Sequence, residues 1–315
     1  MPWHAAAWEQ LGQQLAGGRL PHALLLTGPP DTGVAQCALA LARLLLCAAP
    51  DGGLNCGRCH GCELSAAGSH GDLRWVEPEE KSRVIKVEQV RDTIGFTHGT
   101  AVQGERQVVV LSPADSMNVN ACNALLKSLE EPAPGTYLVL VCARLHGVPA
   151  TIRSRCQLLR LPSPPKQAGL AWLDTVTGDR AASEKLFELA EGRPLLAERL
   201  FREDQVEEVG GRKLALRALL AGEVHAPRVW GLWSDSDPGD FLALLCEELQ
   251  HLARGLPPGD LGSRRGRAVF ALLDEVLDLQ RAVSAGANPG RQLLVDTLLT
   301  KCNRELGAAA LGDTI

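Results

Sequence analysis

Residues Gly104–Cys156 read GERQVVVLSPADSMNVNACNALLKSLEEPAPGTYLVLVCARLHGVPATIRSRC, and this stretch decides the fold. It begins with a short apolar run at 107–111 and contains a second one at 137–142. Between them, residues 118–131 have the apolar spacing of an amphipathic helix, which Pro132 ends. Two buried strands joined by a helix pair in parallel, so the stretch predicts a strand–helix–strand crossover within an α/β fold.

The bulk composition narrows the classes of function. The chain has 315 residues, which predicts two or three domains, and its 45% apolar and 22% charged content is ordinary for a soluble globular protein. A net charge of -5 argues against a uniformly basic, nucleic-acid-binding chain, so any DNA contact would be local or supplied by partners. No apolar run is long enough for a membrane span, and the start lacks the basic flank of a signal peptide. We therefore expect a cytoplasmic protein whose ten cysteines bind metal or stay reduced.

A glycine loop near the start has the context of a phosphate-binding loop. The strand-like run at 23–27 leads into the loop 28–33, with Gly28 and Gly33 correctly spaced, and a helix pattern covers 34–46. An active loop continues with a lysine and then a hydroxyl residue, which contact the outer phosphates and hold magnesium. Val34 and Ala35 occupy those two positions. The pattern therefore predicts the shape of the loop without tight nucleotide binding or hydrolysis.

Three sequence segments resemble motifs of a known protein family. The segment Asn123–Lys127 of the expected helix is followed by Leu129–Pro132 and then by Ser154–Cys156. The order and spacing of these segments are typical of clamp-loader subunits. The chain thus resembles the AAA+ clamp-loader subunits of bacterial replicative DNA polymerase. The resemblance implies an α/β AAA+ domain of the P-loop NTPase type, in a complex that loads a sliding clamp onto primed DNA.

The resemblance also gives a second test of ATPase activity. In active members the strand that corresponds to 107–111 ends in two acidic residues, and Ser112 and Pro113 hold those places here. Asp115 is nearby but displaced along the chain. We therefore expect no ATP bound by this subunit and no ATPase activity of its own. The alternatives are an active gamma/tau-like ATPase subunit, which these residues disfavour, and a zinc-dependent nucleic-acid-binding module, which the acidic composition disfavours.

Arg155 is the candidate catalytic residue. Its guanidinium is permanently charged and forked, which suits the charge that spreads over a transferring phosphoryl group. The resemblance implies that Arg155, with Ser154 and Cys156 as its motif, acts in trans as an arginine finger on ATP held by the adjacent subunit. Without the resemblance, a surface arginine in an ion pair is the simpler interpretation. Arg153 is expected to be structural.

Four cysteines form the candidate metal site. Cys47 precedes the text Cys56-Gly-Arg-Cys59-His-Gly-Cys62, whose overlapping C-x-x-C steps suit a closed tetrahedral zinc site. His60 could replace one of the thiolates. Free thiols or a redox pair fit this density of cysteines less well. The resemblance supports a structural zinc module, because some clamp-loader subunits carry one at this place. The other cysteines, Cys156 included, are expected to be small buried residues.

The sequence as a whole predicts three domains. Residues 1–161 would form the AAA+ domain with its zinc module (about 47–62), and the proline-rich connector 162–165 opens a small helical lid at 162–205. The resemblance implies that Arg193 occupies the position at which active family members have a nucleotide-sensing arginine in this lid. Helical patterns at 212–221, 240–254, 267–285 and 290–306 predict an all-helical collar domain at 206–315. The implied partners are gamma/tau and delta subunits, and through the complex the sliding clamp and primer-template DNA, with no membrane.

Overall fold

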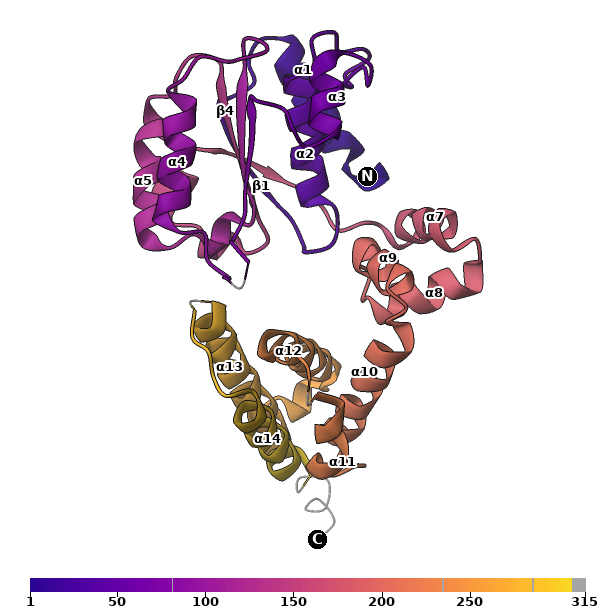
Figure 1. Ribbon diagram of the computed structural model, residues 1–315. Coiled ribbons are helices and arrows are strands. Elements are labelled where there is room, and N and C mark those ends of the chain that lie inside the picture. The colour runs from indigo at the N-terminus through magenta and orange to yellow at the C-terminus, as the bar shows by residue number, and fades with distance from the viewer. Residues whose placement is uncertain (81, 234, 285, 308–315) are drawn as a thin grey trace. The chain divides into compact units, whose positions relative to one another are not determined.

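The computed structural model describes residues 1–80, 82–233, 235–284 and 286–307 (Figure 1). The chain divides into two compact units, Met1–Glu203 and Asp204–Ile315. Residue 285 of a predicted collar helix, and residues 308–315, lie outside the described residues. The finer division into three domains stays a prediction. None of the described helices has the length and apolar character needed to cross a membrane.

A parallel five-stranded sheet forms the centre of the first unit. Its strands lie in the order β2-β3-β4-β1-β5. The bounds are β1 Ala23–Thr27, β2 Leu73–Val76, β3 Gln107–Leu111, β4 Thr136–Cys142 and β5 Gln157–Arg160. The predicted crossover is confirmed, because β3 pairs in parallel with β4, Val109 lying opposite Leu138, and helix α5 (Val119–Glu130) connects them. The sequence analysis missed β5, which pairs with β1 at the edge of the sheet.

Helices cover both faces of this sheet (Figure 1). Helices α1 (Ala5–Ala16) and α2 (Val34–Leu45) lie on one face, and α4 (Val87–Thr97) and α5 lie on the other. Two apolar cores result, one around Leu26 and Leu41, the other around Leu125 and Leu140. The strands are buried on both faces, which explains why they read as continuous apolar runs rather than as alternating ones.

Local chemistry sets the bounds of α5. The Asn118 side-chain oxygen accepts a hydrogen bond of 2.8 Å from the backbone N–H of Ala121, and thus caps the first turn. Pro132 follows the last turn and cannot continue the backbone ladder. The helix therefore begins and ends close to the predicted limits, and it brings Glu130 to the end of the element.

Short helices complete the first unit. They are α3 (His60–Ala66), α6 (Ala150–Arg153), α7 (Lys166–Thr177), α8 (Arg180–Leu189) and α9 (Pro194–Arg202). Helices α7, α8 and α9 form a small bundle after the proline-rich connector. Trp3 packs edge-on against Trp172 of α7, with ring centroids 6.0 Å apart. The indole N–H of Trp3 donates a hydrogen bond of 2.7 Å to the carbonyl of Thr32, so this ring joins the glycine loop to the bundle.

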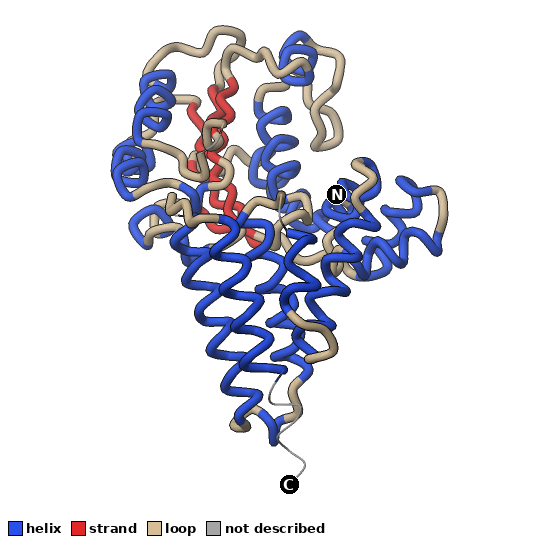
Figure 2. Tube along the Cα trace, turned by 60° about the horizontal axis from the view of Figure 1, so that its bottom comes forward, coloured by secondary structure: helices blue, strands red, loops and turns tan. Residues whose placement is uncertain are grey.

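The described residues of the second unit form helices joined by loops, with no strand among them (Figure 2). Its α-helices are α10 (Val206–Ala221), α11 (Ala226–Trp230), α12 (Pro238–Gly255), α13 (Arg264–Ser284) and α14 (Arg291–Cys302). The core contains Trp233 and Phe241, whose rings pack edge-on at 5.1 Å. The single-turn elements of the whole chain are η1 Pro2–His4, η2 Ala114–Ser116, η3 Leu145–Gly147, η4 Gly231–Trp233, η5 Pro258–Asp260 and η6 Asn303–Gly307.

Candidate functional site

The glycine loop lies between β1 and α2, as the sequence predicts. Gly33 forms the N-cap of α2 with a φ of 98°, a left-handed conformation that favours glycine. Asp31 adopts a positive φ of 55°, and the hydroxyl of Thr32 donates a hydrogen bond of 2.7 Å to the carbonyl of Pro29. The loop therefore has the backbone shape that positions phosphate at a helix N-terminus. Val34 opens the helix as a buried apolar residue, so no ammonium group extends from this position.

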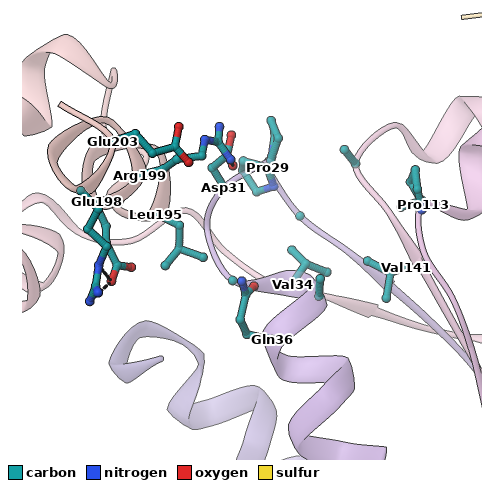
Figure 3. Close-up of a pocket in the computed structure, with 17 residues that line it drawn as sticks. Pro29, Asp31, Val34, Gln36, Pro113, Val141, Leu195, Glu198, Arg199 and Glu203 are labelled. Atoms are coloured by element: carbon teal, nitrogen blue, oxygen red, sulfur yellow. Dashed lines mark hydrogen bonds and ion pairs between the residues drawn. The ribbon is translucent and has the colours of Figure 1, made fainter. Parts of the chain in front are cut away.

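A cavity of about 430 Å³ lies between this loop and helix α9 (Figure 3). Two guanidinium groups line it, those of Arg199 and Arg202, but three carboxylates line it as well. Arg199 pairs with Asp31 at 3.2 Å and Arg202 with Glu198 at 2.7 Å. Glu203 is the third acid. Because acids outnumber bases and both arginines are paired, the charge around the cavity does not favour a polyanion such as a nucleoside triphosphate.

The sequence analysis missed these arginines; it gave Arg193 the place of a nucleotide-sensing arginine, with no phosphate to contact. The described residues that line the cavity do not include Arg193. Its side chain instead donates a hydrogen bond of 2.9 Å to the carbonyl of Ala190. The residues of α9 that face the cavity follow helical spacing from Leu195 to Arg202, a pattern that was readable in the sequence.

The carboxyl end of β3 supplies no acid to the cavity. Pro113 lines it, at one of the two positions that are acidic in active members. Asp115, displaced along the chain, accepts a hydrogen bond of 3.0 Å from Nε of Arg144 and has a side chain only 5% exposed. Asp115 is not among the described residues lining the cavity, so it does not replace a magnesium ligand there.

The four predicted metal ligands come together. The Sγ atoms of Cys47, Cys56, Cys59 and Cys62 all lie within 4.8 Å of one another. Two of these separations are 3.9 Å (Cys47 to Cys59) and 4.0 Å (Cys56 to Cys62). Four thiolates at about 2.3 Å around a tetrahedral zinc would be about 3.8 Å apart, so the cluster fits the ion. His60 is outside this group of ligand atoms in the described part of the chain.

Backbone geometry around the cluster prepares thiolate ligands. Gly57 has a φ of 72°, which allows the tight turn after Cys56, and the N–H of Cys56 donates a hydrogen bond of 3.2 Å to Sγ of Cys47. Hydrogen bonds from the backbone N–H groups of Ala48 and Cys62 lower the pKa of Cys59 to about 6. Burial raises the pKa of the Cys47 thiol to about 11, so this ligand would lose its proton only when metal binds.

The remaining cysteines are mostly in the apolar cores. Burial raises the pKa of each of their thiols above its usual value. Five of them are fully buried, as predicted: Cys37, Cys122, Cys142, Cys246 and Cys302. Cys156 is partly buried and packs against one core of the sheet, and burial raises its pKa to about 12, which disfavours a nucleophilic thiolate.

Arg155 lies on the surface just after α6. Its Nε donates a hydrogen bond of 2.7 Å to Oε1 of Glu130, and Nη2 contacts the same oxygen. Its Nη1 donates to the carbonyl of Thr151 at 2.9 Å and to the hydroxyl of Ser154 at 3.3 Å. The side chain of Arg155 is 35% exposed, and Arg155 is not among the described residues that line the cavity of its own chain.

The parallel sheet, the glycine loop and the small helical bundle together form a AAA+ fold. A solved DNA polymerase III gamma-subunit-related protein of Thermotoga maritima shares this fold, with a TM-score of 0.53 at 17% identity, over 95% of this chain and 99% of that one. The family model described as "DNA polymerase III, delta subunit" matches residues 3–165.

Curated relatives identify the family more narrowly. DNA polymerase III subunit delta′ of Pseudomonas aeruginosa is 38% identical over 95% of this chain and 96% of the relative. The protein of the same name in Haemophilus influenzae is 36% identical over 78% of this chain and 71% of the relative. The chain belongs to the DNA polymerase III subunit delta′ family.

Proposed function

We propose that this chain is a clamp-loader subunit that does not hydrolyse ATP and that completes the active site of a neighbouring ATPase. The partners of the proposed complex are gamma/tau and delta subunits, and the complex would act on the sliding clamp and primer-template DNA in the cytoplasm. Membership of the delta′ family supports this role for the chain as a whole.

One observation carries the proposal: Arg155, the candidate arginine finger, lies outside the cavity beside the glycine loop of its own chain. More carboxylates than guanidinium groups line the cavity, whereas the Arg155 guanidinium lies at the surface, outside that cavity. An arginine so placed cannot stabilise phosphoryl transfer within its own chain. It can do so across a subunit interface, where a finger supplied in trans raises the rate by roughly 10³–10⁵.

We further propose that the four-cysteine cluster holds a structural zinc ion. Cys47, Cys56, Cys59 and Cys62 would be its ligands, which leaves no open position for a substrate or a water. A bound zinc would cross-link the segment between α2 and α3, a segment rich in turns. The ion would thereby stabilise the surface of the AAA+ domain without taking part in chemistry.

The test of the trans role uses the assembled complex with gamma/tau and delta. Clamp- and DNA-stimulated ATP hydrolysis is measured with wild-type protein, with Arg155→Ala and with Arg153→Ala. Arg153 lies two positions earlier, is also exposed and serves as the matched control. Arg155→Ala should greatly slow hydrolysis at the site it serves, while Arg153→Ala retains wild-type turnover. Equal turnover of all three proteins would refute the role of Arg155.

A further inference from the structure

Arg155 is held by a carboxylate on a different element. Glu130 ends α5, and Arg155 follows α6, twenty-five residues later in the chain. Oε1 of Glu130 accepts a hydrogen bond of 2.7 Å from Nε of Arg155 and also contacts Nη2 of the same guanidinium. This contact uses one edge of the planar group, and the Thr151 carbonyl binds Nη1 at 2.9 Å. The rotation of the guanidinium is therefore fixed by its own chain.

We propose that Glu130 is a positioning residue for the trans arginine finger. It anchors the Nε edge of Arg155 before a neighbouring subunit arrives, while the second N–H of Nη2, which none of the contacts to Glu130, Thr151 and Ser154 uses, stays available to a phosphate oxygen. A guanidinium has five N–H donors in a rigid fork, so it can bind a carboxylate by one edge and phosphate oxygens by the other. This inference rests on the proposed function, and it names the residue that prepares the finger.

The benefit of this contact is preorganisation rather than fold stability. The Glu130 side chain is 50% exposed and that of Arg155 is 35% exposed, and exposed ion pairs contribute little to the stability of a fold. An arginine left free would have to be ordered each time the active site assembles. Ordering one flexible side chain reduces an interaction by a factor of about 2 to 10.

The experiment is a double-mutant cycle in the assembled complex. Turnover at saturating ATP and the KM for ATP are measured for wild type, Glu130→Ala, Arg155→Ala and the double variant. Glu131→Ala is the control, because it removes an equal charge from the next residue, which is also exposed. Thermal unfolding of each isolated protein shows whether a substitution acts through stability.

The proposal predicts that Glu130→Ala lowers turnover about 2- to 10-fold without changing KM, that Glu130→Gln recovers part of the loss, and that Glu130→Ala adds nothing to Arg155→Ala. Unchanged or raised turnover in Glu130→Ala overturns it, and so does the same fold loss in the Arg155→Ala background, which would indicate a structural role. If Arg155→Ala itself has no effect, the trans role of Arg155 is what fails. If only Glu130→Ala has no effect, the trans role stands and the positioning role falls.

Discussion

Replacing Cys59 with serine tests the proposed zinc site. The Sγ separations of 3.9 Å (Cys47 to Cys59) and 4.0 Å (Cys56 to Cys62) are within about 0.3 Å of those expected around tetrahedral zinc, so these two pairs need little rearrangement to bind the ion. Structural zinc sites bind with an apparent free energy of about 10–16 kcal/mol at neutral pH, or about 2.5–4 kcal/mol for each of four ligands. Cys59→Ser should therefore weaken zinc binding by about 70- to 900-fold.

The assay is metal content after dialysis against a mild chelator, followed by titration of released zinc with a chromogenic chelator. Wild-type protein should retain one zinc per chain, and Cys59→Ser should retain almost none. Cys246→Ala, which changes a buried cysteine of the second unit, should retain the full amount. Wild-type protein without zinc, with four cluster thiols that react freely with a thiol reagent, would refute the assignment.

Two further predictions concern stability. Leu125→Ala opens a cavity in the core between α5 and the sheet, where Leu125 is 1% exposed, and should cost about 2–5 kcal/mol. The exposed Val119→Ala on the same helix should change stability by less than about 0.5 kcal/mol, and equal denaturation midpoints for both variants would contradict this packing. Burial lowers the pKa of His4 to about 4, so the unfolded chain binds its proton first and stability should fall as the pH drops from about 6.5 to 4. His4→Leu should lose less stability over this range in pH-dependent thermal unfolding, and an equal loss in both proteins would contradict the burial of a neutral imidazole.

The sequence predicted the centre of the sheet best, because its strands are buried on both faces and read as unbroken apolar runs. β5 gave no such signal: it is short, lies at the sheet edge and has Leu158 partly exposed between polar ends. The β-branched residues in Val84–Val87 are typical of a strand, but only Ile85 makes an isolated bridge, with Met117, and Val87 already begins α4. In these places tertiary position decided the structure.

Glycine and proline residues made the helix boundaries of the second unit hard to predict from the sequence. α10 was expected to begin at Arg212, but it begins at Val206 and contains Gly210 and Gly211 in its interior. Glycine lowers intrinsic helix propensity by about 1 kcal/mol, which packing of the rest of the helix overcomes. Proline breaks a helix interior, but Pro227 lies in the first turn of α11, where its missing N–H has no cost.

The candidate site divides in the same way. The spacing of the cysteines was sufficient to identify the four thiols, because residues separated by only a few positions in sequence must lie near one another in space. The Asp31–Arg199 and Glu130–Arg155 pairs join residues far apart in sequence, and nothing local marks them. Partners of this kind become visible only when the fold is known.

The most direct test of the account is a calorimetric titration of the isolated chain with ATP and magnesium. Val34 and Pro113 stand where an active site has its lysine and one of its magnesium-binding acids, and the arginines that line the cavity are paired with carboxylates. We therefore expect no saturable binding up to about 1 mM ATP, which corresponds to a binding free energy weaker than about -4 kcal/mol. Stoichiometric, magnesium-dependent binding with a micromolar dissociation constant would contradict the account.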